Sequence, residues 1–257
     1  MNIFNQNEKA WDKQVENSTA YTQAVSSESI EQAKNGNWSI IVTTHKPVPR
    51  NWFPEDLNGI NILCLASGGG QQAPILSAAG ANVTVVDISE KQLDKDRVVA
   101  KRDHLAIEIQ KANMTNLSIF PNSYFDIVIN PVSSLFIKDL SPFWKETNRV
   151  LKKGGTLITG FTNPILFIFD DEEDLKGNLV VKNKIPYSTL DNLSETEINE
   201  FIKSSKTIEF GHTLESQIQG QFDHGFVMNG FYEDDFNGNR PLDKYLKCFI
   251  VTKSIKQ

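Results

Sequence analysis

The sequence predicts an α/β fold organised around a parallel sheet, and three features carry that prediction. Residues 62–65 (ILCL) and 83–86 (VTVV) are short, largely apolar runs, typical of strands that are covered on both faces. A segment of helical length, residues 71–79, separates them, as a crossover between parallel strands requires. Three consecutive glycines, residues 68–70, stand between the first strand and this helix, where the chain must turn sharply.

The glycine turn and an acid after the second strand predict a site for a nucleoside cofactor. Glycine takes positive φ readily and lets a ligand approach the backbone N–H groups at the start of a helix. Gly80 can end that helix, and Asp87 follows the second strand, where a carboxylate can accept both hydroxyls of a ribose. A dinucleotide is disfavoured, because Ala73 and Pro74 follow the turn and the third glycine of the dinucleotide fingerprint is absent.

At this point residues 63–70, LCLASGGG, resemble the first motif of the class I S-adenosylmethionine-dependent methyltransferases, in particular those that act on small molecules. Ala66, Gly68 and Gly70 fall on the small positions of the motif, and Asp87 falls on the acid that holds the ribose. Cys64 departs from the family, which has an acid there. The resemblance implies S-adenosyl-L-methionine as cofactor and transfer of its methyl group to O, N or C of a small molecule.

The resemblance also implies the remaining cofactor contacts. Ile88 would pack on the adenine, Asn113 and the backbone of Met114 would bind its edge, and Asn130 would support the methionine moiety through its backbone. The predicted cofactor-binding set is Ala66, Ser67, Gly68, Gly70, Gln71, Asp87, Ile88, Asn113, Met114 and Asn130. The sequence after Asn130 only partly matches the Asn-Pro-Pro-aromatic signature of amino-group methyltransferases, because it reads Asn-Pro-Val-Ser.

The implied fold is the Rossmann-like class I methyltransferase fold, a seven-stranded, mostly parallel sheet with an antiparallel last strand and helices on both faces. Residues 149–160, RVLKKGGTLITG, resemble the turn that leads into its fifth strand. We expect residues 1–57 to form an N-terminal helical and loop cap, and residues 58–257 to form the methyltransferase domain. An insertion is expected at about residues 163–193.

Local patterns predict the other elements in chain order. Amphipathic helices are expected at 8–23 and 140–151, and a polar helix at 27–34. A further helix is expected in the charged segment after Ser89, and Ser89 is its N-cap. Strands are expected at 105–110, 125–130, 226–232 and 245–253, the last two forming an antiparallel pair. Prolines exclude regular structure from the aromatic segment 38–54.

The expected insertion and the segment after it carry weaker signals. The acids at 170–174 read as a solvated charge run rather than a metal site, and Val180, Val181 and Ile185 indicate a short hairpin. Ser194 and Glu197 form a capping box for a helix that runs to about residue 205. Thr213 caps another helix, whose apolar face holds Leu214, Ile218 and Phe222.

The methyl acceptor would lie among the parts with the least recognisable pattern. His212 is the preferred general base, since histidine titrates near neutrality. Tyr21, His45, Ser133 and Gln217 are predicted to line the acceptor pocket. Two other functions stay open, a binding module that holds S-adenosylmethionine without turnover and a nicotinamide-dependent oxidoreductase.

Composition limits the partners of the chain. Its 257 residues carry a formal charge of -6 and a pI near 5.3, which argues against a nucleic-acid substrate. No apolar run is long enough to cross a bilayer, and the N-terminus lacks the pattern of a secretion signal, so a cytoplasmic location is expected. Cys64 and Cys248 lie in apolar runs and read as buried thiols. No metal site is expected, and a monomer and a homodimer both remain open.

Overall fold

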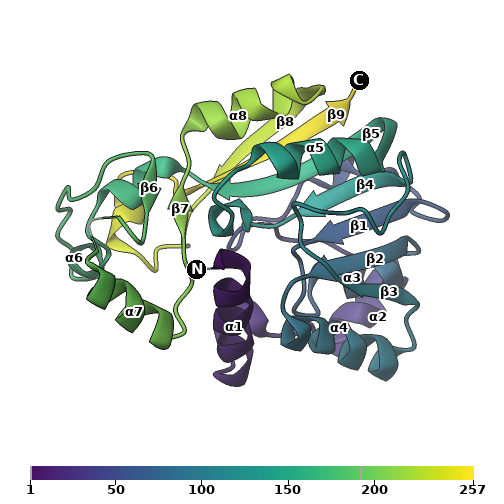
Figure 1. Ribbon diagram of the computed structural model, residues 1–257. Helices are drawn as coiled ribbons and strands as arrows, with labels where there is room; N and C mark the ends of the chain where they lie inside the picture. Colours follow the sequence, from purple (N-terminus) through teal and green to yellow (C-terminus); the bar gives the residue numbers. More distant parts are fainter. Residues whose placement is uncertain (1, 192) are drawn as a thin grey trace.

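A seven-stranded sheet in the order β3-β2-β1-β4-β5-β9-β8 organises the computed structural model, which describes residues 2–191 and 193–257 (Figure 1). Strands β1 to β5 pair with one another in parallel, whereas β9 is antiparallel to both β5 and β8. The strands are β1 Asn61–Leu65, β2 Asn82–Asp87, β3 Ile107–Lys111, β4 Phe125–Asn130, β5 Leu151–Thr162, β8 Phe226–Asp234 and β9 Phe249–Lys256. The predicted fold class is thereby confirmed, including the antiparallel end of the sheet.

Helices cover both faces of this sheet (Figure 1). The α-helices are α1 Ile3–Glu16, α2 Ser27–Lys34, α3 Gln72–Ala78, α4 Glu90–Asp103, α5 Ser141–Val150, α6 Asp171–Leu175, α7 Glu195–Lys203 and α8 Leu214–Asp223. Alternate residues of β1 point into different cores: Ile62 and Cys64 pack with α2, α3 and α4, whereas Leu63 and Leu65 pack with α5. Short 3-10 turns lie at Ala20–Thr22, Arg50–Trp52, Ser134–Phe136, Pro164–Ile168 and Pro241–Lys244, and are η1 to η5.

The expected boundaries near the glycine turn are close to those of the structure. Gly80 has a φ of +105° directly after α3, and the Ser89 hydroxyl accepts a hydrogen bond from the Gln92 N–H at the start of α4. Helix α2 has the bounds that its pattern predicts. Local propensity and burial therefore agree in this part of the chain.

The first helix lies earlier in the chain than the expected range 8–23. Asn2 caps it, because its side-chain oxygen accepts hydrogen bonds from two backbone N–H groups, and Ser18 ends it in the left-handed region at φ +52°. Helix α1 stands between α7 on one side and α4 on the other (Figure 1). Gln6 donates to the carbonyl of Ile202 on α7 and to that of Lys206 just after this helix, and Asp12 accepts from Ser89 before α4.

Two expectations for the insertion were wrong. Val181 forms an isolated bridge with Phe169, and the two-residue strand β6 (Tyr187–Ser188) pairs instead with β7 (Phe210–Gly211). The acids at 170–174 are not all solvated, because Asp174 is fully buried and pairs with Arg240. The capping box of Ser194 and Glu197 at the start of α7 is confirmed. The insertion boundaries remain a prediction, and residue 192 lies outside the described residues.

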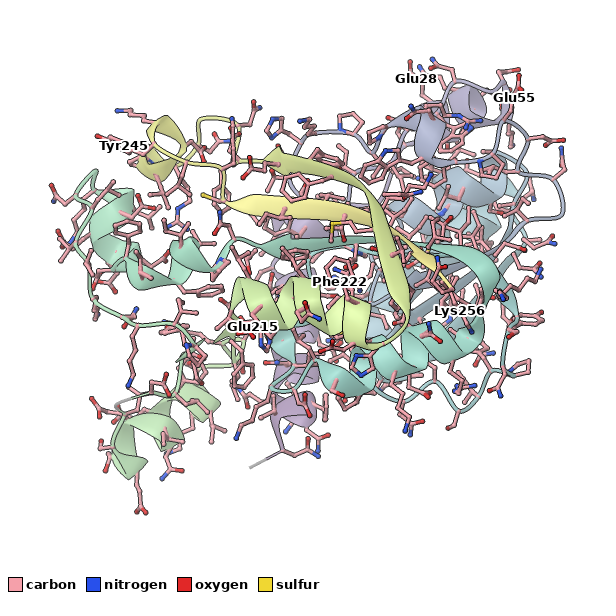
Figure 2. All side chains as sticks on the ribbon, turned by 90° about the horizontal axis from the view of Figure 1, so that it is seen from above. Glu28, Glu55, Glu215, Phe222, Tyr245 and Lys256 are labelled. Atoms are coloured by element: carbon pink, nitrogen blue, oxygen red, sulfur yellow. The ribbon has the colours of Figure 1, made fainter. Side chains whose placement is uncertain are left out.

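Helix α8 is rotated away from the orientation that its apolar pattern predicts, and of that pattern only Ile218 is half-buried. Gln217 and Gln221 face the interior, while Leu214 and Phe222 are 42% and 43% exposed. Figure 2 labels Phe222 on this helix. Hydrogen bonds in the interior explain this orientation, because the Gln221 side-chain oxygen accepts from the hydroxyls of Thr252 and Ser254 on β9. In the described part of the chain, no helix has the length and apolar character that a membrane crossing requires.

Candidate active site

A cavity of about 450 Å³ opens at the carboxyl ends of β1, β2 and β4. We divide its lining into a sheet-edge side, from residues 66–72, 87–92 and 112–137, and an outer wall, which comprises the other lining residues. The outer wall consists of Phe4, Trp11, Gln14, Tyr21, Thr43, Thr44, Thr162, Leu166, Asp171, Thr207, Glu209, Phe236, Arg240 and Phe249. Open α/β sheets bind their ligands at this edge.

Asp87 and the glycine turn hold each other in place. The Gly68 N–H donates to Asp87 Oδ2 at 2.9 Å, and the Ser89 N–H donates to Asp87 Oδ1 at 2.9 Å. A carboxylate has about four acceptor sites, so both oxygens can still accept a hydroxyl from the cavity. Burial raises the pKa of Asp87, and the two N–H groups oppose that rise by stabilising the ionised form.

The start of α3 is fastened to the N-terminal segment. Ser67 Oγ donates to Gln72 Oε1 at 2.9 Å, and Gln72 Nε2 donates to the Ile41 carbonyl at 2.7 Å. Gln71 Nε2 donates to the Gln23 carbonyl at 3.0 Å, beside Tyr21. Ser67, Gln71 and Tyr21 thus line the cavity as predicted, and Gln72 is a cavity residue that sequence reasoning missed.

Gly70 supports the turn from outside the cavity lining. Its φ is +70°, and a Cβ there would lie 3.1 Å from the Lys95 carbonyl oxygen and 3.0 Å from Ala24 Cβ. Ala66 also has a positive φ, +49°, and lines the cavity. The turn is therefore pressed between α4 and the N-terminal segment, which leaves room only for glycine at this point.

A buried carboxylate that sequence reasoning missed lies behind the glycine turn. Asp96, on α4, is fully buried, and its Oδ2 accepts from the Gly69 N–H at 3.1 Å. Its Oδ1 has no hydrogen-bond partner within residues 2–191 and 193–257. Burial raises the pKa of Asp96 to about 7. Cys64 on β1 is fully buried, and burial raises the pKa of its thiol. Besides Asp87, the acid that contacts the turn therefore comes from α4 rather than from β1.

The remaining predicted cofactor residues divide into cavity and support residues. Ile88, Asn113 and Met114 line the cavity, although Asn113 Oδ1 already accepts from the Thr115 N–H and hydroxyl. Asn130 is fully buried outside the lining. Its Nδ2 donates to the Leu65 carbonyl at 2.8 Å and to Ser133 Oγ at 2.7 Å, so it joins the ends of β1 and β4 and positions Ser133, which lines the cavity.

His212 and Gln217 do not line the cavity. His212 Nε2 donates to the carbonyls of Ser134 and Ile137, at 3.2 and 2.9 Å, and burial lowers its pKa. Gln217 donates to Ser134 Oγ at 3.1 Å. Both side chains therefore hold η3, the turn that carries Phe136 into the cavity, and the general-base role of His212 stays an untested prediction.

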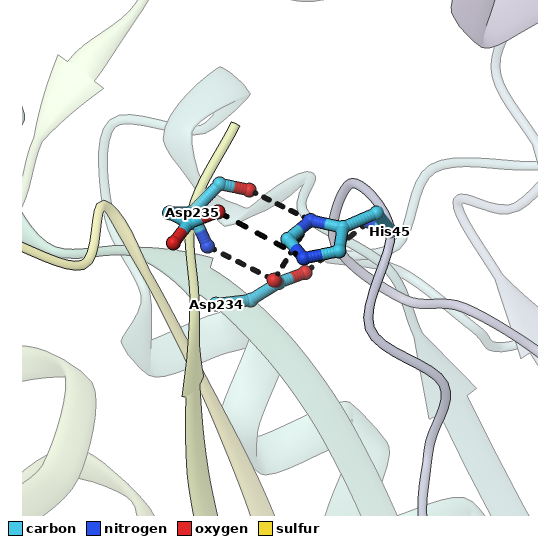
Figure 3. Close-up of side chains that lie close together, drawn as sticks. All are labelled: His45, Asp234 and Asp235. Carbon is cyan, nitrogen blue, oxygen red and sulfur yellow. Dashed lines mark hydrogen bonds and ion pairs between the residues drawn. The ribbon is translucent and has the colours of Figure 1, made fainter. Parts of the chain in front are cut away.

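His45 also lies outside the lining, in a cluster with Asp234 and Asp235 (Figure 3). Its Nδ1 is 3.0 Å from Asp234 Oδ1. Asp234 Oδ2 accepts from the Thr43 hydroxyl at 2.6 Å and the Lys46 N–H at 3.1 Å, and such bonds lower its pKa to about 2 against the opposing effect of burial. Lys247 pairs with Asp235. Because protein donors already occupy these oxygens, the cluster fastens residues 43–46 to the end of β8.

The outer wall brings together side chains that no motif connects. Trp11 meets Phe136 edge to face, with ring centroids 5.4 Å apart. Asp171, Glu209 and Arg240 also line it, from α6, from the segment before β7 and from the β8–β9 connection. Sequence reasoning missed these residues, since a lone acid or arginine on an irregular segment reads as solvated surface.

Known proteins share both the fold and much of the sequence. The profile of a family described as "Methyltransferase domain" matches residues 63–159. The chain is 50% identical over 250 residues to the uncharacterized methyltransferase YbaJ of Bacillus subtilis (strain 168), covering 97% of each chain. It is 28% identical over 110 residues to a ubiquinone biosynthesis O-methyltransferase of Pelagibacter ubique, covering 43% of this chain and 45% of that one.

Among solved structures, an S-adenosylmethionine-dependent methyltransferase from Mesorhizobium loti aligns with a TM-score of 0.61 at 16% identity, over 80% of this chain and 95% of that one. This likeness concerns the fold. Fold and cavity together define an α/β protein with a cavity at the carboxyl edge of its parallel strands. With the full-length relationship to YbaJ, the chain belongs to the methyltransferase family.

Proposed function

We propose that this protein transfers the methyl group of S-adenosylmethionine to a small molecule. The observation that carries the proposal is Asp87, held by the N–H groups of Gly68 and Ser89 with acceptor sites left toward the cavity. A cytoplasmic site of action and a small-molecule acceptor complete the proposal.

The sheet-edge residues fit the cofactor. Asp87 would accept the ribose hydroxyls, Ile88 would pack on the adenine, and Gly68 would allow close approach, since any Cβ there would lie 3.1 Å from Asp87 Oδ2. The cofactor supplies an electrophilic methyl carbon on a sulfonium. The protein aligns the acceptor with it and excludes water, and such alignment accounts for most of the rate in a displacement of this kind.

The proposal is tested by calorimetry with S-adenosylmethionine, S-adenosylhomocysteine and NAD. We expect micromolar affinity for the first two, a loss of at least about 100-fold in Asp87→Ala, and no NAD binding. Asp94→Ala is the matched control, since Asp94 is an exposed aspartate on α4, shortly after Asp87 in the chain, and contacts Arg97. NAD binding would support the oxidoreductase. Binding of S-adenosylmethionine without turnover of any acceptor would support the binding module.

A further inference from the structure

Glu209 is the most firmly positioned carboxylate of the outer wall. On the preceding residue, the Ile208 N–H donates to Asn7 Oδ1 at 2.7 Å and the Ile208 carbonyl accepts from Asn7 Nδ2 at 3.0 Å. The Glu209 N–H donates to Thr189 Oγ1 at 3.0 Å, and its carbonyl accepts from the Thr189 N–H at 3.0 Å. The backbone here is thus fixed from α1 and from the insertion, and it directs the side chain to the cavity.

The carboxylate itself is only partly satisfied by the protein. Its Oε1 accepts from the Thr207 hydroxyl at 2.9 Å. Within residues 2–191 and 193–257, Oε2 has no protein donor and no cation lies within ion-pair distance of Glu209. An ionised carboxylate can only accept hydrogen bonds, so a ligand that meets Oε2 must bring an N–H or O–H.

The charge of the outer wall selects among such ligands. Within the described part of the chain, Arg240 is the one cationic side chain among the residues that line the cavity. It is already matched by two carboxylates, because its Nη2 lies 2.7 Å from Asp171 Oδ1 and its Nε 2.7 Å from Oδ2 of the buried Asp174. Glu209 therefore leaves the wall with excess negative charge, which repels anionic ligands and favours cationic ones.

Aromatic side chains also line the cavity. Trp11, Phe136 and Tyr21 line the same cavity as Glu209, and Trp11 is held edge to face by Phe136. Aromatic faces attract cations and cover apolar surface. A carboxylate beside aromatic rings is thus suited to an ammonium group on an apolar body.

We propose that Glu209 binds the methyl acceptor and that this acceptor is a primary or secondary amine on an apolar, largely aromatic body. The inference rests on the methyltransferase function proposed above. The ammonium donates to Oε2 and passes one proton to it. The neutral nitrogen then forms the N–C bond as the methyl C–S bond breaks, and that electron pair stays on sulfur. The proton on Glu209 leaves to solvent. Burial raises the pKa of Glu209, which suits it to this transfer.

The test uses the full chain with S-adenosylmethionine and measures release of S-adenosylhomocysteine from matched pairs. The pairs are 2-phenylethylamine with 3-phenylpropionate, tryptamine with indole-3-propionate, and cyclohexylmethylamine with cyclohexylacetate. We expect the amines to react at least about tenfold faster than the acids. Glu209→Gln should lower kcat/KM for the amines by about 100-fold or more, while the affinity for S-adenosylmethionine changes less than about twofold.

Two further variants separate a contact role from a structural one. Glu209→Asp keeps the charge and should recover part of the lost kcat/KM, and Glu215→Gln, an exposed position on α8, should leave it unchanged (Figure 2). Preference for the acids, inert amines in a protein that binds S-adenosylmethionine, or unchanged amine turnover in Glu209→Gln would each overturn the assignment. Failure to bind S-adenosylmethionine would instead contradict the proposed function itself.

Discussion

The two sides of the cavity are assembled in different ways. The sheet-edge side comes from strand ends between residues 61 and 137, and its key bonds join neighbouring motifs, as between Gly68 and Asp87. The outer wall comes from α1, from the segments around Asp171 and Glu209, and from the β8–β9 connection. If the proposed function holds, cofactor recognition depends mainly on motifs close together in the sequence, whereas acceptor recognition depends on contacts between distant parts of the chain.

The largest effect expected on the sheet-edge side follows from Gly68→Ala. The added Cβ would lie 2.8 Å from Gln92 Cβ and 3.1 Å from Asp87 Cβ, so the turn must move away from Asp87. We expect the affinity for S-adenosylmethionine to fall by about 100-fold or more, as measured by calorimetry. Affinity close to that of the wild type would show that the turn does not touch the cofactor.

Because of Asp96, which lies behind the glycine turn of the sheet-edge side, we expect the stability of the protein to depend on pH. The folded-state pKa of Asp96, about 7, lies above the usual value of 3.8, so the folded state holds the proton more tightly than the unfolded state. The cofactor-free protein should therefore lose about 2 kcal/mol of stability as pH rises from 5 to 8. Asp96→Asn should remove most of this loss, as measured by urea unfolding at both pH values.

The same carboxylate should also affect cofactor binding. A cationic cofactor favours the ionised form of Asp96, so affinity for S-adenosylmethionine should rise between pH 6 and pH 8. S-adenosylhomocysteine lacks the sulfonium charge and should respond less. Equal pH profiles for both ligands in wild type and Asp96→Asn would contradict an electrostatic role.

Asn7→Ala should affect the outer wall alone. Asn7 is 1% exposed, and it donates to the Phe136 carbonyl at 3.0 Å besides its two bonds with Ile208. We expect a loss of about 1–3 kcal/mol in stability and of about tenfold in acceptor kcat/KM, because Glu209 loses its support. Affinity for S-adenosylmethionine should stay within about twofold. Asn5→Ala, exposed on the same helix, is the control, and an equal loss of cofactor affinity would argue against two separable sides.

The smallest effect is expected from His212→Gln. Because His212 donates to two backbone carbonyls outside the cavity lining, its replacement should change kcat/KM by less than about threefold. A decrease of about 100-fold, with loss of a pH-dependent step, would restore it as the general base. The assay is the amine panel described for Glu209.

The fold and the site could be predicted from the sequence where they are determined by residues close together in the chain. The glycine turn, Asp87, the caps at Ser89 and Ser194 and the mostly parallel sheet with its antiparallel last strand could be inferred, because each depends on residues within one element or on a family motif. The buried position of Asp96 could not be inferred, since an acid inside a highly charged helix is expected to be solvated. The orientation of α8 was missed because its burial is set by hydroxyls on β9 rather than by its own apolar pattern. No local sequence pattern identifies Glu209 or Arg240 as a residue of the cavity.

The link between Asn7 and Ile208 has a consequence for the order of folding. These residues are 201 positions apart, so their contact forms only after a very long loop has closed. The strands from Asn61 to Asn130 can pair before that event, because their partners are close in sequence. The sheet-edge side should therefore form first. The outer wall should be the first part to open, so the amides around Ile208 should exchange their hydrogens faster than those of β1.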